Sequence, residues 1–204
     1  MKIIGIGKNY VNNLSEMPKG EVVPLIFTKP DSSLLENDED LELPSFSDDV
    51  WYEVELAFRI GEKCKNATTK NALSFVDAVA LANDLTAKDV LTKSREPNKG
   101  PWALAKGFDG ATPISSFLPI SEFSDVANIN FSMTVNREET QKGNSSLMIT
   151  PLAKLITYVS GIMTLNPGDI LLSGTPASGA NKVNSGDHMV GYLEGKQMFS
   201  TKVK

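Results

Sequence analysis

Two glutamates separated by a single residue form the pattern in this chain that most directly suggests chemistry. Glu53 and Glu55 lie in the run Trp51-Tyr52-Glu53-Val54-Glu55-Leu56-Ala57-Phe58, whose aromatic and apolar residues are typical of a strand. Side chains on a strand alternate between its faces, so both carboxylates point to the same side. Like charges on one face repel unless water or a cation separates them, and hard dications such as Mg²⁺ prefer carboxylate oxygens. A solvated polar face is the simpler interpretation of the same pattern.

A third carboxylate, Asp84, ends the apolar stretch 80–84. A carboxylate at the end of such a strand acts either as a helix cap or as a ligand, and its position alone does not decide between them. Three other kinds of functional site are excluded, because the residues that each requires are not all present. The third glycine of a dinucleotide loop after residues 5–7 would fall at Tyr10, and the stretch 174–179 lacks the Lys and Ser or Thr that complete a phosphate loop. His188 is the only histidine, which excludes a histidine-based zinc cluster.

The composition narrows the class of protein. The 204 residues are 41% hydrophobic and 22% charged, as in folded domains with an ordinary core, and we expect one domain over residues 1–204. A formal net charge of −5 offers no basic surface for nucleic acid or anionic lipid, so neither is an expected partner. The single cysteine, Cys64, suits a reducing compartment. With no signal-peptide or transmembrane pattern, we expect a cytoplasmic protein.

Hydrophobic periodicity predicts more strands than helices. Strands are expected over residues 2–6, 25–28, 51–60, 79–83, 129–135 and 170–173, with a hairpin over 188–203. Helices are expected over 70–76, from Thr86 (as cap) towards Ser94, and after Pro151, where the apolar stripe is Leu152, Leu155, Ile156, Val159, Ile162 and Met163. A short helix or lid is expected over 9–17 and a solvated loop or hairpin over 36–49. Because regular βαβ alternation is absent, the fold class is mixed β-rich α+β.

A series of short motifs follows in order along the chain: Gly7-Lys8-Asn9-Tyr10, Phe27-Thr28-Lys29-Pro30, Ser32-Ser33-Leu34, Tyr52-Glu53-Val54-Glu55-Leu56, Asn83-Asp84-Leu85-Thr86-Ala87-Lys88-Asp89, Leu104-Ala105-Lys106-Gly107-Phe108-Asp109, Gln141, Gly143, Asn144, Met148, Met163-Thr164-Leu165, Pro167-Gly168-Asp169 and Gly174-Thr175-Pro176. Together these pieces resemble the fumarylacetoacetate hydrolase family, specifically its short single-domain members, such as acylpyruvate hydrolases and 2-hydroxyhepta-2,4-diene-1,7-dioate isomerases. No single piece is specific, but their order over nearly the whole chain is.

The resemblance implies a compact β-roll of mixed sheets with a few short helices, of the family's C-terminal type, usually as a homodimer. It also implies Mg²⁺ or Mn²⁺ held by Glu53, Glu55 and Asp84, and substrates that are small 2-oxo or β-diketo acids. Such an acid chelates a dication through its carboxylate and the adjacent carbonyl oxygen, and an enolate is stabilised there as it forms. The same device serves C–C hydrolysis of acylpyruvates, decarboxylation of oxaloacetate-like acids, and keto–enol or double-bond isomerisation.

The resemblance assigns roles to further residues. Lys106 is implied near the metal, where it positions water and the anionic intermediate, and Lys29 supplies a cation to the pocket. Thr175 and the Gly174 backbone are implied to bind the substrate carboxylate. Arg95 and Lys99 could contact the distal end of the substrate, although solvated loop charges are the simpler interpretation.

The chain departs from the family's hydrolytic members at one position. Those members carry a histidine and a glutamate three residues apart after the Asn-Tyr pair. Here Glu16 is present, but the histidine position holds Asn13, whose amide cannot take up a proton at neutral pH. Either Glu16 acts alone as general base, provided that it is buried, or His188 swings in, or the chain favours reactions that need mainly enolate stabilisation.

Three functions therefore stay open. The leading expectation is a metal-dependent hydrolase that cleaves a C–C bond in an acylpyruvate-type acid. The first alternative is an oxaloacetate-type decarboxylase or a hydroxyheptadienedioate isomerase. The second is a catalytically silent binder of metal and carboxylate. Asn13 favours the alternatives, whereas the intact set of acidic residues, Lys106 and Thr175 favours surviving chemistry.

Overall fold

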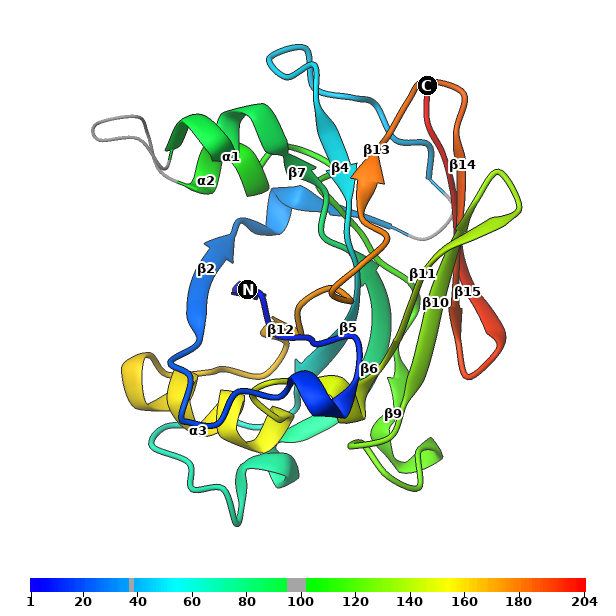
Figure 1. The fold of residues 1–204 in the computed structure, drawn as a ribbon. Helices are drawn as coiled ribbons and strands as arrows, with labels where there is room; N and C mark the ends of the chain where they lie inside the picture. The colour runs from blue at the N-terminus through cyan, green and yellow to red at the C-terminus, as the bar shows by residue number, and fades with distance from the viewer. Residues whose placement is uncertain (37–38, 95–101) are drawn as a thin grey trace.

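The computed structural model describes residues 1–36, 39–94 and 102–204, so Arg95 and Lys99 lie outside the described residues. Strands dominate these ranges, as predicted (Figure 1). The α-helices are short: α1 (Lys88–Ser94), α2 (Trp102–Lys106) and α3 (Leu152–Ile162). In the described ranges no helix has the length and apolar content needed to cross a membrane.

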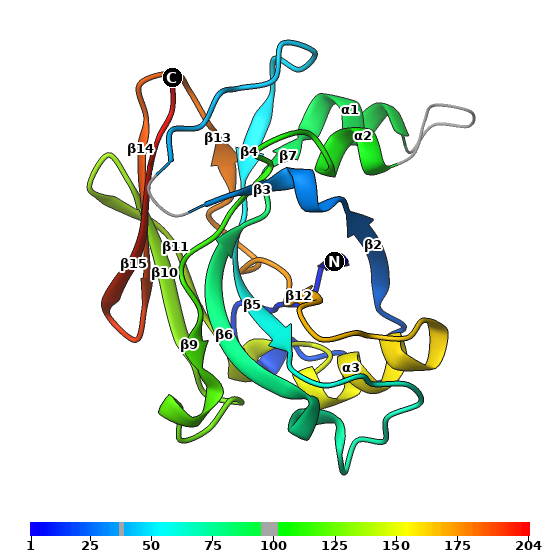
Figure 2. The ribbon, with the colours of Figure 1, turned by 180° about the vertical axis from the view of Figure 1, so that it is seen from behind.

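A strongly curved six-stranded sheet forms the frame of the molecule. Its strand order is β2-β1-β12-β5-β6-β9, with β1 and β12 parallel and the other neighbours antiparallel. The strands are β1 (Ile3–Gly7), β2 (Leu25–Lys29), β5 (Val54–Ile60), β6 (Val76–Asn83), β9 (Leu118–Pro119) and β12 (Ile170–Leu172). The curl of this sheet places β2 opposite the long β5–β6 pair (Figures 1 and 2).

A second, four-stranded antiparallel sheet lies alongside β5 and β6 (Figure 1). Its order is β11-β10-β14-β15, with β10 (Asn130–Val135), β11 (Glu138–Asn144), β14 (His188–Leu193) and β15 (Lys196–Lys202). Phe131 and Met133 of β10 are buried together with Phe58 of β5 and Leu81 of β6, so the main core lies between the two sheets. The hairpin expected over 188–203 is confirmed, and so is the alternation along 129–133.

Smaller pairings complete the frame, and some of their strands pack against α1 and α2. Strand β4 (Val50–Tyr52) lies between β7 (Thr86–Ala87) and β13 (Asn181–Lys182), while β3 (Leu34–Leu35) pairs with β8 (Thr112–Pro113). The buried stripe of α3 matches the prediction except at its end, where Ile162 is 53% exposed. The helix expected over 70–76 is a 3₁₀ helix over Ala72–Phe75.

The strand expected over 51–60 is wrong in one respect, because it is interrupted at Glu53. The segment before the break pairs with β7 and β13, and the segment after it pairs with β6 and β12. At the break, the backbone N–H of Glu53 donates to the side-chain oxygen of Asn83 (2.8 Å) instead of to a neighbouring strand. Thr86 is likewise no helix cap: it lies in β7, and its hydroxyl donates to the carbonyl of Asp84.

Candidate active site

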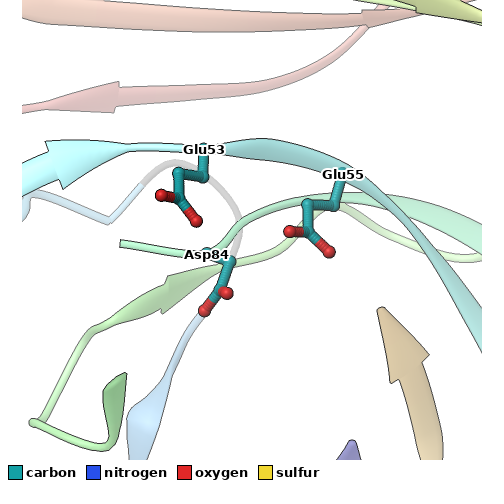
Figure 3. Close-up of side chains that lie close together, drawn as sticks. All are labelled: Glu53, Glu55 and Asp84. Atoms are coloured by element: carbon teal, nitrogen blue, oxygen red, sulfur yellow. The ribbon is translucent and has the colours of Figure 1, made fainter. Parts of the chain in front are cut away.

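Three carboxylates converge near the break between β4 and β5 and the end of β6. Glu53 lies at the break between β4 and β5, Glu55 lies in β5, and Asp84 follows the last residue of β6. One carboxylate oxygen from each lies within 4.8 Å of the others, and the close-up shows the three side chains close together and extending in the same general direction (Figure 3). Glu55 and Asp84 are buried and Glu53 is half-buried. For Glu55, therefore, the solvated polar face is the wrong interpretation.

Strand register fixes this convergence. In the antiparallel β5–β6 ladder Val54 lies opposite Asn83. Glu53, which precedes Val54, therefore lies next to Asp84, which follows Asn83. The backbone N–H of Asp84 donates to the carbonyl of Glu53 (2.8 Å). The backbone N–H of Glu53 in turn donates to the side-chain oxygen of Asn83. A register slip of one residue would turn Glu55 to the opposite face.

Two buried lysines pair with the carboxylates. Lys106, at the end of α2, donates to Glu53 (2.9 Å) and Asp84 (2.5 Å). Lys29, at the end of β2, donates to the other oxygen of Asp84 (2.5 Å) and to the carbonyl of Ala111 (2.9 Å). The resemblance implied that Lys29 faces a pocket, but its side chain has no exposed surface and its charge acts through Asp84.

Burial and neighbouring charges together set the pKa values of these four groups. Burial would raise the pKa of Asp84, but the ammonium groups of Lys106 and Lys29 hold that pKa below its ordinary value. The pKa of Glu55 is raised well above its ordinary value, first by burial and then by the charge of Asp84. Burial would lower the pKa of Lys106, yet Asp84 and Glu53 raise it. The pKa of Lys29 is lowered by its complete burial.

The donor set fits a hard dication. Within the described ranges Glu55 has no ammonium partner, and its carboxylate instead accepts the backbone N–H of Gly174 (2.7 Å). Two oxygens bound to one ion at about 2.0–2.6 Å are separated by no more than about 4–5 Å, which matches the observed spacing. Three carboxylates and two ammonium groups leave one net negative charge. Glu53, Glu55 and Asp84 could therefore hold a metal ion.

The segment 173–175 forms the wall next to Glu55. Asn9 holds it from one side, because its side-chain amide donates to the carbonyls of Ser173 (2.9 Å) and Thr150 (3.2 Å). The Tyr10 hydroxyl lies 3.1 Å from Ser173 Oγ. Gly174 has φ +93°, and a Cβ there would lie 2.8 Å from the Cβ of Asn9, so no other residue fits without a shift. The N–H of Gly174 is already bonded to Glu55, which leaves Thr175 as the carboxylate-binding candidate of this pair.

Glu16, the expected catalytic residue, differs from the three carboxylates in its environment. It belongs to the 3₁₀ helix Leu14–Glu16, is exposed, and accepts from the Asn13 side chain (2.6 Å) and the Asn12 backbone (3.0 Å). The burial that a general base acting alone would need is absent. His188 begins β14 in the other sheet, with Nε2 2.7 Å from Ser200 Oγ.

Sequence reasoning gave no role to four polar residues that hold this site: Asn9, Tyr10, Asn83 and Gln141. All four are buried, and each bonds to a residue that lies far from it in sequence. The available signal was a polar residue at an otherwise apolar position, as at the end of the stretch 79–83. Such a residue is buried only when it has a hydrogen-bond partner, but its partner cannot be read from the sequence.

Comparison with known proteins settles the family. A sequence model described as fumarylacetoacetate (FAA) hydrolase C-terminal matches residues 2–204. The chain belongs to the fumarylacetoacetate hydrolase family. Oxaloacetate tautomerase YcgM of Escherichia coli is 36% identical over 201 residues, covering 97% of this chain and 90% of the relative. The mitochondrial oxaloacetate decarboxylase of Dictyostelium discoideum is 38% identical over 189 residues, covering 91% and 85%.

A solved structure supports the same assignment. Fumarylpyruvate hydrolase from Pseudomonas aeruginosa, in complex with Mn²⁺ and pyruvate, has a TM-score of 0.90 to this chain at 28% identity. The match covers 100% of this chain and 89% of the hydrolase. The predicted mixed-sheet fold of the fumarylacetoacetate hydrolase family is thus confirmed, and the chain is an enzyme of that family. The names of its relatives cover more than one reaction.

Proposed function

We propose that this fumarylacetoacetate hydrolase family protein is a divalent-metal-dependent enzyme that interconverts the keto and enol forms of an oxaloacetate-type 2-oxo acid. One observation carries the proposal. The buried carboxylates and lysines are assembled for charge stabilisation, whereas the turn that would activate water pairs an exposed Glu16 with the amide of Asn13. Enolisation needs the first arrangement and the transfer of the C3 proton to or from a base such as solvent water, but no attack of water on carbon.

The chemistry of the site supports an acidic substrate. A dication held by Glu53, Glu55 and Asp84 would supply a Lewis acid for the carbonyl oxygen of the 2-oxo acid. Lys106 keeps a proton at Nζ beside two of these carboxylates, so it can stabilise or protonate an oxygen that becomes negative. The hydroxyl of Thr175 is the candidate donor to the carboxylate.

Local charge supports a dicarboxylate in particular. Besides Lys29 and Lys106, Lys88 Nζ lies 3.7 Å from Glu53 Oε1. Three ammonium groups balance the three carboxylates, and a dication then leaves two positive charges. Oxaloacetate carries two negative charges at neutral pH, so the complex would be balanced. The names of the tautomerase and decarboxylase relatives agree with this substrate class.

Hydrolysis of an acylpyruvate-type acid is the second candidate, because the fumarylpyruvate hydrolase shares this fold along the full length of the chain. The Asn13–Glu16 pair disfavours it. Decarboxylation of oxaloacetate releases CO2 and leaves the enolate of pyruvate, which the same charges could stabilise, so it is a third outcome at this site. The homodimer, the cytoplasmic location and the choice between Mg²⁺ and Mn²⁺ stay predictions.

A panel of three assays separates these reactions. Purified protein is given enol-oxaloacetate, keto-oxaloacetate and an acylpyruvate, each with Mg²⁺, Mn²⁺ or chelator, and absorbance at the enol band and pyruvate release are followed. The proposal predicts metal-dependent loss of the enol band without pyruvate release, and slower acylpyruvate cleavage. Rapid cleavage of the acylpyruvate with no effect on the enol band would contradict the proposal and identify the protein as a hydrolase. No turnover with any of the three would favour the silent binder.

A further inference from the structure

We infer that Gln141 is a positioning residue that orients the hydroxyl of Thr175 toward the carboxylate of the substrate. The inference deepens the proposed function, since it concerns how the same site recognises an acid. Gln141 lies in β11, in the second sheet, and is 1% exposed. Its side chain reaches across to the first sheet and bonds to both walls of the candidate site.

The first contact is with the backbone between the two glutamates. Gln141 Oε1 accepts the N–H of Val54 at 2.8 Å. A backbone N–H can only donate, so the atom that it faces must be the amide oxygen of Gln141. This contact fixes the orientation of the amide, and Nε2 necessarily points the other way.

The second contact is with Thr175. Gln141 Nε2 lies 2.9 Å from Thr175 Oγ1, and because Nε2 can only donate, the hydroxyl oxygen is the acceptor. The proton of that hydroxyl is therefore free to be donated elsewhere. No acceptor for it lies among the described residues, and Thr175 is only half-buried. The arrangement presents an O–H donor whose direction is set by one buried amide.

The backbone around Gln141 makes this bridge necessary. Strand β12 stays bonded to β5 as far as Ser173, whose N–H donates to the carbonyl of Leu56 (2.9 Å), and the chain then separates from β5. Beyond that point side chains span the gap: Glu55 receives the N–H of Gly174, and Gln141 joins Val54 to Thr175. The same glutamine thus sets how far the metal-binding strand lies from the carboxylate-binding residue.

The following segment also rests on β11. Gly179 has φ +90°, and a Cβ there would lie 2.0 Å from the carbonyl oxygen of Thr140. A Cβ on Gly143 would lie 3.0 Å from Pro176. The residues that follow Thr175 therefore pack against the second sheet, and the Thr175 side chain is bonded to the same sheet through Gln141.

A double-mutant cycle on oxalate binding tests the inference without turnover. Calorimetry with Mg²⁺ present measures oxalate affinity for the wild type, Gln141→Met, Thr175→Val and the double variant. Each single change is expected to weaken oxalate about tenfold, and the double variant should be no weaker than about that, because both remove one interaction. Affinity for Mg²⁺ alone should change by less than about threefold, and Thr175→Ser should keep oxalate binding.

Matched variants control for other causes. Gln197→Met makes the same change at an exposed glutamine of β15 and should leave both affinities unaltered. If Gln141→Met does not fold, Gln141→Glu keeps an acceptor for Val54 but offers Thr175 a second acceptor. Thr175→Val should then have no further effect in that background, whatever the added charge does to oxalate.

Several results would overturn the inference. If Thr175→Val leaves the oxalate affinity unaltered, Thr175 does not bind the carboxylate. If Gln141→Met leaves it unaltered, Gln141 does not position Thr175. Effects that multiply in the double variant would mean that the two residues act independently. Loss of Mg²⁺ affinity in Gln141→Met would mean that it supports the glutamates instead. If the cycle holds while oxaloacetate is not turned over, the proposed function fails and the inference stands.

Discussion

The acidic triad and the turn at Glu16 place carboxylates in opposite settings. At the triad the carboxylates are mostly buried, and their partners Lys29 and Lys106 come from elements 55 and 22 residues from Asp84 in sequence. At the turn the carboxylate is exposed and bonds to Asn12 and Asn13, its own neighbours. Burying charge costs free energy unless the charges are paired, so the first arrangement needs the whole fold and the second does not. The difference supports the proposal that the buried cluster carries the chemistry.

The largest effect is expected from removing a triad carboxylate. Asp84→Asn keeps the shape of the side chain but removes the negative charge that pairs with Lys29 and Lys106 and that the proposed metal site needs. Turnover of oxaloacetate should fall by at least about 10²–10³-fold, and the dependence on Mg²⁺ should be lost. Steady-state kinetics over a Mg²⁺ titration measure both.

The matched control for this change lies on the same strand. Asp77, at the other end of β6, is exposed and pairs with Arg59 (2.9 Å). Asp77→Asn should keep turnover within about twofold, since surface ion pairs contribute about 0–1 kcal/mol. Equal losses in Asp77→Asn and Asp84→Asn would show a general effect on folding and would remove the argument from burial.

A comparison of two lysines gives the next largest effect. Lys106 is buried and bonded to two triad carboxylates, whereas the side chain of Lys88 is 34% exposed and lies further from Glu53. Lys106→Met should lower kcat by about 10²-fold, and Lys88→Met should act mainly on KM by less than about tenfold. An unaltered kcat in Lys106→Met would remove that lysine from the reaction.

The Glu16 turn can be strengthened to test the other half of the comparison. Asn13→His should raise cleavage of an acylpyruvate by about tenfold, because an imidazole beside Glu16 can accept a proton from water. Asn13 also caps the 3₁₀ helix through the N–H of Ser15, so some stability should be lost. Asn12→His in the same turn is the control. No rise in Asn13→His would mean that the missing histidine does not limit hydrolysis.

The sequence predicted the local features and missed those that depend on distant partners. The alternation in 51–58 placed Glu53 and Glu55 on one side, and the hairpin over 188–203 followed from its turn residues. The break at Glu53 was missed because its cause, the side chain of Asn83, lies 30 residues away. The burial of Lys29 was missed for the same reason. Order among the motifs, rather than any single pattern, indicated the family.

The smallest effect concerns a carboxylate with a structural role. Asp169 is buried beside Ile170, and it accepts the N–H of Asn166 (2.8 Å) and of Lys2 (2.7 Å) and pairs with the Lys2 side chain. Burial would raise the pKa of Asp169, but these contacts hold it below its ordinary value. A lowered folded-state pKa stabilises the fold above about pH 4, and the gain is lost as the pH falls through the lowered value.

Asp169→Asn should therefore reduce the free energy of unfolding by about 1–3 kcal/mol at neutral pH, with little effect on turnover. Denaturant unfolding of both proteins from pH 7 to pH 3 measures the difference, which should shrink toward acid. A difference that grows toward acid would have the wrong sign for this account.

The most direct test of the account is calorimetric titration of the metal-stripped protein with Mn²⁺ or Mg²⁺. The wild type should bind one dication per chain, and Asp84→Asn should bind it at least about tenfold more weakly, whereas Asp77→Asn binds it as the wild type does. A wild type that binds no dication, or an Asp84→Asn variant that binds it equally well, would contradict the assignment of Glu53, Glu55 and Asp84 as a metal site.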